Sequence, residues 1–354
     1  MTVSDHRTAN DSRLSNLLRE VSREPLTGLV AANLTARCRV GAAQQPVVVG
    51  ASGGPDSSAL VLVLAALARR RVAGPEPIIV CVHHGLRAEA DEECAMTARL
   101  ARRLGLPFER VDIRPALRPG NLSANARDER YAALRAAAIR NGAALVATAH
   151  HADDRLETML LALARGRGLR GLATPRWGRS LGEGVRLVRP LLNATKQQCV
   201  ALCERVGVAS ATDPSNADSS RARGHLRNAV LPALLSRYPG LAKHASSTAD
   251  EAAIALRALE SMAKRRFGEG SRWKRRDFSG ADLTLTAWVF RRAAFRIDAE
   301  SALLVPRRGW EQMARAAVGD GTRPRTFEWS HRIRGIVTLE HVALETQTKE
   351  LRLL

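Results

Sequence analysis

The chain lacks any apolar run long enough to cross a membrane. Its longest, Ala59–Ala68, is about half of the ~20 residues that a membrane-spanning helix needs. The first residues, MTVSDHRTANDSRLSN, are polar with early acids, unlike the start of a secretory signal. We therefore expect neither export nor membrane insertion, and a cytoplasmic location.

Cysteine is scarce, and no C-x-x-C motif is present. The five cysteines are odd in number, scattered, and mostly in apolar segments: Cys38, Cys81, Cys94, Cys199 and Cys203. Cys199 and Cys203 stand four apart on a predicted helix, which is neither a redox motif nor a complete zinc set. We interpret this pair as structural, and the cysteine usage as a whole fits a reducing cytoplasm.

Acidic residues are few relative to basic ones. The chain has 55 Lys and Arg against 35 Asp and Glu, a formal net charge of +20. Replacement of Lys by Arg in a GC-rich genome raises the arginine count but does not by itself unbalance the acids. Such a surplus serves no purpose in folding, so it favours a polyanionic partner, with nucleic acid as the leading candidate.

The glycine-rich turn in Val47–Arg71, VVVGASGGPDSSALVLVLAALARRR, lacks the lysine of a Walker P-loop. Gly53 and Gly54 allow positive φ and close backbone approach, and the following helix adds its positive end, so the turn suits a phosphate. Asp56 and Ser57 occupy the positions after the glycines. We therefore expect a phosphate cradle of another kind, with a carboxylate that holds Mg²⁺ or handles a proton. The alternative is an ordinary strand, turn and helix with Asp56 as the N-cap.

Short apolar segments alternate with helices from Pro46 onward. The expected strands are Val47–Val49, Ile78–Val82, Phe108–Ile113, Ala144–Ala149 and Val185–Val188. The expected helices are Ser57–Arg70, Ala90–Leu104, Ser123–Arg140, Asp153–Leu163 and Thr195–Val206. This alternation predicts an α/β fold with a doubly wound, Rossmann-like parallel sheet.

In doubly wound sheets, ligands bind beyond the carboxyl ends of the strands, where the strand order reverses. With the order 3-2-1-4-5, the loops after the first and fourth strands face each other across the crevice. ASGGPDSS follows the first strand, and HHADDRLET follows the fourth. We therefore expect the functional site between these two loops.

Three segments are expected along the chain. Residues 1–43 are predicted to be a polar tail with one helix, Leu14–Val21. Residues 44–235 hold the α/β domain. Residues 236–354 are predicted to form a mainly helical, basic C-terminal domain with a final strand near Ile336–Leu344.

One basic segment of the C-terminal domain contains aromatic residues. Lys264–Phe278, KRRFGEGSRWKRRDF, could bind phosphates while Phe267 or Trp273 stacks on a base. The alternative is a solvated helix face with buried aromatic rings. On the first interpretation this domain contacts a nucleic acid.

Several motifs together resemble those of the tRNA(Ile)-lysidine synthetases, which are PP-loop ATP pyrophosphatases. The shared motifs are SGGPDS at Ser52–Ser57, HHGLR at His83–Arg87, NARDERYAAL at Asn125–Leu134, ATAHHADDRLETMLLALARGRGLRGL at Ala147–Leu172, RPLL at Arg189–Leu192 and DPSN at Asp213–Asn216. The resemblance covers roughly residues 47–235. The first motif alone indicates only the superfamily, whereas the long fourth-strand motif is much more specific.

The resemblance implies a two-step ligation that uses ATP and Mg²⁺. ATP adenylates the C2 carbonyl oxygen of the wobble cytidine of an isoleucine tRNA with a CAU anticodon, and pyrophosphate leaves. The amine of free L-lysine then displaces AMP. On the matching positions, the nucleotide-binding residues are Ser52, Gly53, Gly54, Pro55, Asp56 and Ser57. Asp56 is the expected Mg²⁺-linked carboxylate, and Arg127 is the expected clamp for a phosphate or base.

The resemblance assigns the lysine amines to Asp154 and Glu157. These acids stand three apart at the start of a helix, hence on one face beside the crevice. The alternative is that they only offset the helix dipole. A lysine ammonium with a pKa near about 10.4 must bind as a cation and attack as a neutral amine, a change that costs about 4.6 kcal/mol at pH 7.

Two histidine pairs end predicted strands: His83 with His84, and His150 with His151. Adjacent residues of a strand point to opposite faces, so at most one of each pair faces the crevice. We expect structural or nucleotide contacts from them rather than a metal site.

The chain departs from the family pattern in two places. Arg155 stands where the family usually has Gln, and Arg221, Arg223 and Gly224 replace the usual aromatic and Arg-Asn pattern. No catalytic role is therefore carried over beyond Asn216.

Two rival functions remain open. A tRNA thiolase of the same superfamily requires paired reactive cysteines or an iron-sulfur site near the cleft. A non-catalytic ATP- or RNA-binding module binds ATP without releasing pyrophosphate.

Overall fold

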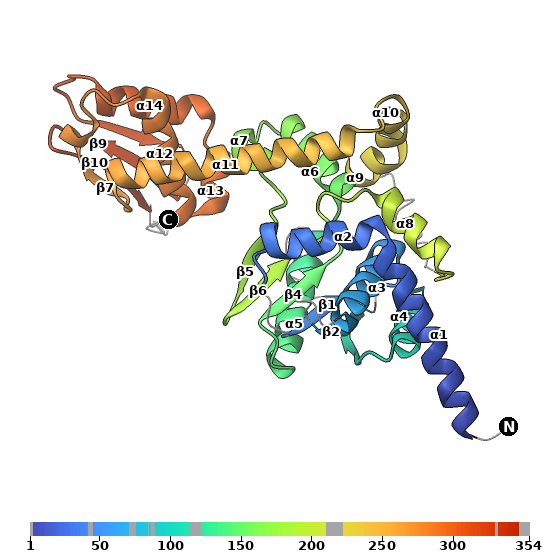
Figure 1. Ribbon diagram of the computed structural model, residues 1–354. Helices are drawn as coiled ribbons and strands as arrows, with labels where there is room; N and C mark the ends of the chain where they lie inside the picture. Colours follow the sequence, from blue (N-terminus) through green and yellow to red (C-terminus); the bar gives the residue numbers. More distant parts are fainter. Residues whose placement is uncertain are drawn as a thin grey trace. The chain divides into compact units, whose positions relative to one another are not determined.

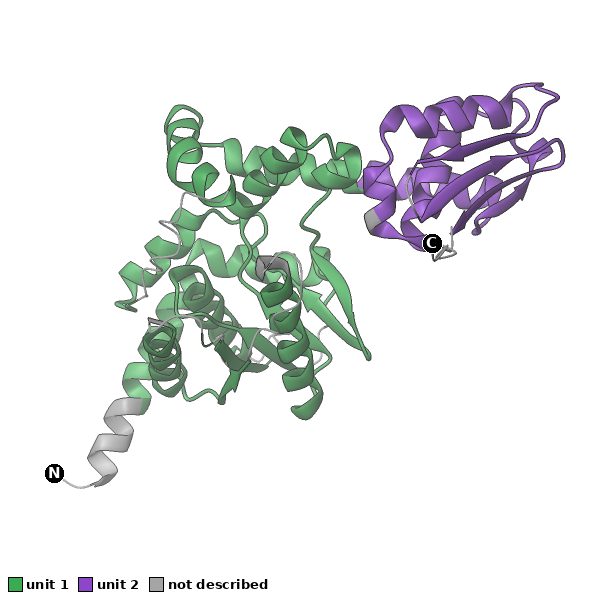
Figure 2. Ribbon diagram, turned by 180° about the vertical axis from the view of Figure 1, so that it is seen from behind, with its two compact units in different colours: residues 1–253 green, residues 254–354 purple. Residues whose placement is uncertain are grey.

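The computed structural model describes residues 3–41, 45–70, 76–83, 85, 89–113, 122–209, 222–329 and 332–346. The chain forms two compact units, Met1–Ala253 and Ile254–Leu354 (Figure 2). We call them unit 1 and unit 2. Within the described residues, no helix combines the length and apolarity that a membrane crossing requires.

A six-stranded sheet with the order β3-β2-β1-β4-β6-β5 forms the centre of unit 1. The strands are β1 (Pro46–Gly50), β2 (Glu76–His83), β3 (Phe108–Asp112), β4 (Leu145–Thr148), β5 (Gly178–Gly182) and β6 (Val185–Val188). The first five strands in this order pair in parallel, which confirms the predicted order of the parallel strands. The edge strand β5 pairs antiparallel to β6 and was not predicted, because it has two glycines and no buried residue.

Helices cover both faces of this sheet (Figure 1). One face is covered by α1 (Val3–Arg23), α2 (Pro25–Ala32), α3 (Pro55–Arg69), α4 (Glu89–Leu104) and α8 (Lys196–Arg205), and the other by α5 (Leu122–Arg140). Unit 1 also contains α6 (Ala152–Ala164), α7 (Gly168–Leu172), α9 (Ala222–His225), α10 (Leu231–Arg237) and the π-helical turns η1 (Asn33–Arg37) and η3 (Leu226–Val230). Val47 and Val49 of β1 pack in the core that contains α3, whereas Val48 packs with α5. This alternation shows the doubly wound fold.

The N-terminal segment is part of the core of unit 1, so its description as a polar tail over residues 1–43 is wrong. Leu17 and Val21 of α1 and Leu26 and Val30 of α2 are buried in the same cluster as α3. The predicted helix Leu14–Val21 lies within α1. Its apolar residues recur at helical spacing, and the polar residues between them fill the exposed face.

Unit 2 contains helices and a four-stranded sheet with the order β7-β10-β9-β8. Its elements are β7 (Arg272–Lys274), η4 (Arg275–Phe278), α12 (Leu283–Ile297), α13 (Ala299–Leu304), α14 (Arg307–Val318), β8 (Arg325–Glu328), β9 (Ile333–Val337) and β10 (His341–Thr346). All its strand pairs are antiparallel. Helices hold more of its residues than strands, as predicted, but the single expected strand near Ile336–Leu344 is a hairpin of β9 and β10.

The long helix α11 (Leu241–Phe267) begins in unit 1 and ends in unit 2. Figure 1 shows it as one continuous helix. Ala242 and Ala245 of α11 are buried in a cluster with Ala152 and Leu156 of α6. The unit boundary therefore falls inside α11, later than the boundary predicted after residue 235.

The aromatic residues of Lys264–Phe278 are core residues of unit 2. Phe267, Trp273 and Phe278 are buried, and the rings of Phe267 and Phe278 stack with centroids 4.7 Å apart. Phe290 of α12 packs against both Trp273 and Phe278. Phe267 and Trp273 are thus not available to stack on a base, and the alternative of buried rings holds.

Candidate functional site

The loop between β1 and α3 forms a closed turn at the start of a helix. Gly53 has a φ of +74°, and a Cβ at this position would lie 2.7 Å from the Glu93 carbonyl oxygen, so only glycine fits. The Ser52 amide donates to Ser57 Oγ at 3.2 Å, and Ser57 Oγ donates to the Gly54 carbonyl at 3.0 Å. Gly54 has a φ of −74°, so the expected positive φ is confirmed for Gly53 alone. The first-turn amides of α3 have no acceptor within the helix and can bind an anion.

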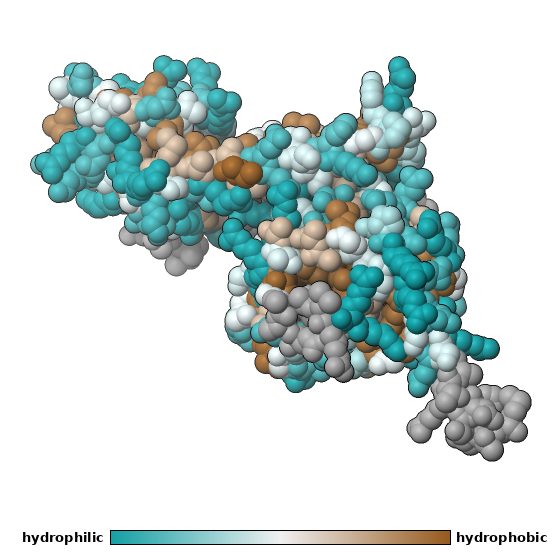
Figure 3. Space-filling model, in the orientation of Figure 1, coloured by the Kyte–Doolittle hydropathy of each residue, from teal (hydrophilic) through white to brown (hydrophobic). Residues whose placement is uncertain are grey.

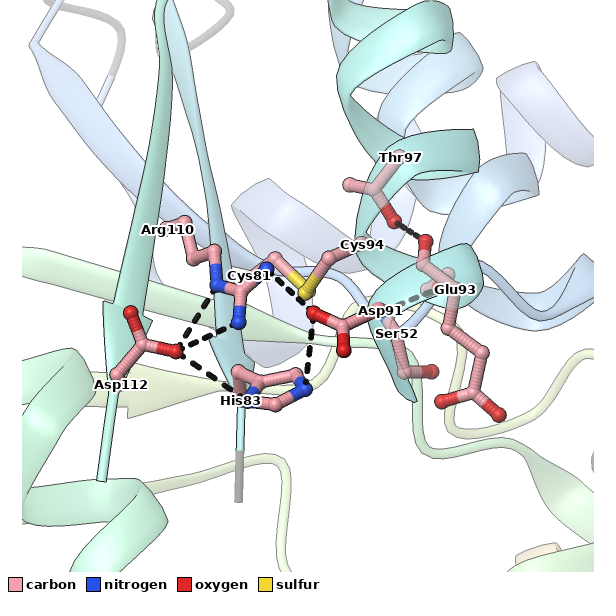
Figure 4. Close-up of a disulfide and its surroundings, with 10 residues drawn as sticks. Ser52, Cys81, His83, Asp91, Glu93, Cys94, Thr97, Arg110 and Asp112 are labelled. Atoms are coloured by element: carbon pink, nitrogen blue, oxygen red, sulfur yellow. Dashed lines mark hydrogen bonds and ion pairs between the residues drawn. A yellow bond between two sulfur atoms is a disulfide. The ribbon is translucent and has the colours of Figure 1, made fainter. Parts of the chain in front are cut away.

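A disulfide lies behind this loop. Cys81 of β2 and Cys94 of α4 are bonded, with their Cα atoms 5.9 Å apart. Figure 4 shows the bond beside Ser52 and Glu93, the residue whose carbonyl packs on Gly53. This bond was not predicted, because the pairing depends on the packing of α4 against β2 and leaves no local motif.

The other cysteines are free and buried: Cys38, Cys199 and Cys203. Burial raises the pKa of the Cys38 thiol to about 11 and that of Cys203 to about 12. These thiols are protonated and unreactive at neutral pH.

His151, the N-cap of α6, joins the two loops. Its Nε2 lies 3.5 Å from Asp56 Oδ2 and 3.7 Å from Asp154 Oδ2, and its Nδ1 lies 3.3 Å from Asp153 Oδ2. Burial lowers the pKa of His151, but Asp154, Asp153 and Asp56 outweigh this effect and hold the pKa well above 6.5. The side chain is therefore an imidazolium between acids. The loops after β1 and β4 meet, as the pairing of these strands predicts.

Asp56 has an unsatisfied oxygen beside the anion-binding turn. Its Oδ1 is buried and has no hydrogen-bond partner among the described residues. No cluster of three or more His, Cys, Asp or Glu side chains suited to a metal occurs in the described part of the chain. A single carboxylate fits Mg²⁺, which is commonly held by one or two carboxylates together with phosphate oxygens and waters.

Asp154 and Glu157 lie together on α6, as predicted, but arginines are already paired with them. Glu157 is 2% exposed and accepts hydrogen bonds from Nε of Arg223 at 2.8 Å and Nε of Arg227 at 2.7 Å. Asp154 Oδ1 lies 3.8 Å from Arg223 and 3.6 Å from Arg227. Burial raises the pKa of Asp154, but the charge of His151, a hydrogen bond from the His151 backbone amide and the charge of Arg223 outweigh it and hold the pKa well below 3.8.

Sequence reasoning missed the role of these two arginines. Arg223 and Arg227 belong to α9 and η3. They stand four apart in the sequence, a spacing that places two side chains on one helix face opposite an acid pair. That spacing was the available signal.

Arg127 of α5 lies in a group of arginines around the buried Tyr131. Its Nη2 is 3.3 Å from the Tyr131 hydroxyl, and its guanidinium carbon is 5.4 Å from the ring centroid. Arg130 and Arg179 lie over the same ring at 5.5 and 4.6 Å. Burial lowers the pKa of Arg127, and the charges of Arg130, Arg223 and Arg179 also lower it, against the opposing effect of Tyr131. The sequence indicated Arg127 but not its neighbours.

His150 and His83, the other described members of the histidine pairs, contact neighbouring side chains. His150 Nδ1 is 3.0 Å from Thr148 Oγ1, and burial, assisted by nearby arginines, lowers its pKa well below 6.5. His83 Nδ1 lies 3.2 Å from Asp112 Oδ1, in an ion-pair group with Arg110 (Figure 4). His84, the DPSN segment and Arg221 lie outside the described residues.

Parts of this chain are similar to proteins of a known family. Residues 18–234 match the family model of the PP-loop domain. A tRNA(Ile)-lysidine synthase of Salinispora arenicola is 44% identical over 230 residues, 62% of this chain and 65% of the relative. This chain thus spans less than two thirds of that relative's length. A tRNA(Ile)-lysidine synthase of Bradyrhizobium sp. (strain BTAi1) is 35% identical over 269 residues, 72% of this chain and 75% of the relative.

A distant solved structure shares the fold. The U34-tRNA thiolase NcsA from Methanococcus maripaludis with its [4Fe-4S] cluster superposes with a TM-score of 0.51 at 15% identity, over 68% of this chain and 79% of that one. The likeness concerns the fold alone. The chain belongs to the PP-loop family and, within it, to the tRNA(Ile)-lysidine synthase family.

Proposed function

We propose that the protein ligates free L-lysine to C2 of the wobble cytidine of an isoleucine tRNA with a CAU anticodon, with ATP as the activating substrate. One observation carries the proposal: His151 contacts both Asp56, beside the anion-binding turn, and Asp154, in the acid pair of α6. A site for phosphates and a site for an ammonium group therefore adjoin. The names of the relatives at 35–44% identity support the same activity.

On the nucleotide side, the turn Ser52–Ser57 binds the phosphates through its backbone amides and the helix N-terminus. Asp56 would hold Mg²⁺, which when bound would neutralise phosphate charge. Arg127 binds a phosphate oxygen or the base, because its guanidinium has several donors in one plane. Activation of the cytidine oxygen then depends on positioning and charge stabilisation.

On the lysine side, the ionised carboxylates of Asp154 and Glu157 attract the ammonium groups. Arg223 and Arg227 already contact both acids, so the substrate shares the carboxylates with these guanidinium groups or displaces them. Nearby positive charge lowers the pKa of an ammonium group. The arginines thus offset part of the about 4.6 kcal/mol needed to form the neutral amine at pH 7.

The thiolase alternative requires reactive paired cysteines. Cys81 and Cys94 are paired, but they are 2% and 4% exposed and are bonded to each other between β2 and α4. The close relatives are named lysidine synthases, whereas the thiolase is similar only in fold. We therefore favour ligation.

The test uses purified protein, an unmodified isoleucine tRNA transcript, ATP and radiolabelled lysine. We expect label in the tRNA only when ATP is present, with release of AMP and pyrophosphate. Failure to label this tRNA refutes the proposal. Bound iron with sulfur transfer supports the thiolase instead, and ATP binding without pyrophosphate release supports a non-catalytic module.

A further inference from the structure

Arg155, at the position where Gln is usual in the family, is completely buried. It is 1% exposed, although it directly follows Asp154 and lies two positions before Glu157 in α6. Its Nε donates to the Pro175 carbonyl at 3.2 Å, and its Nη1 donates to the carbonyl and Oγ of Ser246 at 2.8 and 2.9 Å. Its contacts are thus with α11 and the chain after α7, and not with the acid pair.

Asp250 of α11 neutralises this buried charge. Its Oδ1 lies 2.8 Å from Nη2 of Arg155 and accepts a hydrogen bond of 2.8 Å from Nε1 of Trp177. The Trp177 ring lies under the Arg155 guanidinium, with 5.1 Å between the guanidinium carbon and the ring centroid. Arg37 completes the group at 3.8 Å from Asp250 Oδ2. Every side of the Arg155 head therefore has an acceptor or a ring.

The same helix contact determines where the acid pair and its arginines lie. Ala152 and Leu156 of α6 pack with Ala242 and Ala245 of α11 and with Leu231 of α10. Arg223 and Arg227 belong to α9 and η3, the segment that leads directly into α10 and α11. A shift of α11 against α6 therefore moves both partners of the acid and arginine group. The phosphate-binding turn belongs to β1 and α3 and is closed by its own hydrogen bonds.

We propose that Arg155 and Asp250 are a positioning pair, which docks α11 on α6 and so sets the geometry of the lysine site. The inference rests on the proposed function for its substrate. Neither residue touches the substrate in this proposal. In this chain the buried Arg155 guanidinium takes its counter-charge from Asp250, so Arg155 requires Asp250.

The physical reason lies in what each substitution leaves behind. Arg155→Gln leaves the partly buried Asp250 carboxylate with only Trp177 and the more distant Arg37, and Asp250→Asn leaves the fully buried Arg155 guanidinium without its counter-charge. A single unpaired charge is strongly unfavourable, whereas replacement of both charges by neutral polar groups is close to neutral. The two single changes should therefore shift α11, and the double change Arg155→Gln/Asp250→Asn should restore it.

The experiment compares the wild type, both single variants and the double variant in the lysine ligation assay. We expect each single change to raise the KM for lysine about tenfold and to leave the KM for ATP within about twofold, since displacement of a binding group weakens only the site it serves. The double variant should return to within about threefold of the wild type, a coupling that independent sites do not show. An unchanged lysine KM in both single variants overturns the proposal.

A stability control separates positioning from general loss of folding. Val21→Ala removes a fully buried side chain of α1 in the same unit and leaves the α6 and α11 contacts in place. This variant should lose stability without a change in the KM for lysine. If its KM for lysine rises as much as that of Arg155→Gln, the effect is structural and the proposal fails.

Hydrogen exchange gives a readout that does not need the enzymatic activity. Peptides from α6 should exchange faster in both single variants and recover in the double variant, while peptides from α3 stay unchanged. Normal exchange of α6 in the single variants refutes the positioning role, even if the wild type ligates no lysine. A wild type with no activity but with this exchange pattern refutes only the proposed function.

Discussion

At the scale of single residues, Asp56 carries the nucleotide half of the proposal. Its unpaired, buried Oδ1 lies beside the phosphate-binding turn. Asp56→Ala should reduce tRNA-dependent pyrophosphate release at least about a hundredfold, since charge stabilisation of phosphoryl transfer depends on it. Asp112→Ala, which changes an exposed acid at the end of β3, should leave the rate within about twofold. Normal pyrophosphate release by Asp56→Ala contradicts the assignment.

Asp154 is the residue on which the proposed lysine site depends. Loss of one charged hydrogen bond weakens binding by about 1.5–3 kcal/mol, so Asp154→Asn should raise the KM for lysine about 10- to 100-fold with ATP and tRNA affinities unchanged. Asp153→Asn is the matched control, because Asp153 accepts the Lys196 amide at 2.8 Å and is not assigned to the substrate. Steady-state kinetics at varied lysine concentration measures both. Equal effects of the two substitutions contradict the role of Asp154.

His151 makes the stability of the site depend on pH. Its pKa in the folded protein lies well above the unfolded value of about 6.5, so its charged form stabilises the fold below pH ~6.5, and this contribution is lost as the pH rises through the folded pKa. The difference in unfolding free energy between the wild type and His151→Asn should therefore be largest near pH 6 and fall toward alkaline pH. Urea denaturation at several pH values measures it. If the difference in unfolding free energy between the two proteins grows with pH, His151 is not an imidazolium in the folded protein.

At the scale of elements, the disulfide ties α4 to β2 behind the phosphate-binding turn. Cys81 and Cys94 are 13 residues apart, and closure of a loop of this size stabilises by about 3 kcal/mol through the entropy of the unfolded chain. A reducing agent should lower the unfolding free energy of unit 1 by about this amount. The variant Cys81→Ala/Cys94→Ala should be insensitive to the reducing agent. If the reducing agent changes the unfolding free energy of the variant and the wild type equally, the Cys81–Cys94 bond does not stabilise the protein.

The sequence predicted those elements whose packing leaves a local pattern. Strand order and the meeting of the loops after β1 and β4 follow from apolar runs that alternate with helices. The core role of α1 was missed because its apolar stripe is narrow among polar residues, and β5 was missed because its exposed glycines carry no alternation. The pairing of Cys81 with Cys94 depends on tertiary contacts between distant segments and leaves no local signal. For Arg223 and Arg227, the sequence shows that they share a helix face, but not that this face meets Glu157.

At the scale of the whole molecule, the net charge of +20 is the main feature. Hydrophilic residues cover much of the visible face of both units in Figure 3. Among the described residues, Arg155 and Arg189 lie in the interior with defined partners, Arg155 with Asp250 and Arg189 with the Arg176 carbonyl, so the whole surplus is not a binding surface. The exposed basic side chains of Lys264–Phe278 remain available to phosphates, because only the aromatic rings of this segment are buried.

The affinity for tRNA should therefore depend on salt. Each neutralised phosphate contributes about 0.7–0.9 to the slope of log affinity against log salt, so binding should weaken steeply from low to physiological salt. The variant Lys274→Gln/Arg276→Gln removes two exposed cations of the basic segment and should reduce the slope by about 1.4–1.8. The control Arg205→Gln removes an arginine that is paired with Glu24 at 3.1 Å, and should leave the slope unchanged. Filter binding or fluorescence anisotropy at several salt concentrations measures all three proteins. Equal slopes for the double variant and the wild type would place the phosphate contacts elsewhere on the chain, because a cation that releases no counterion on binding lies outside the interface.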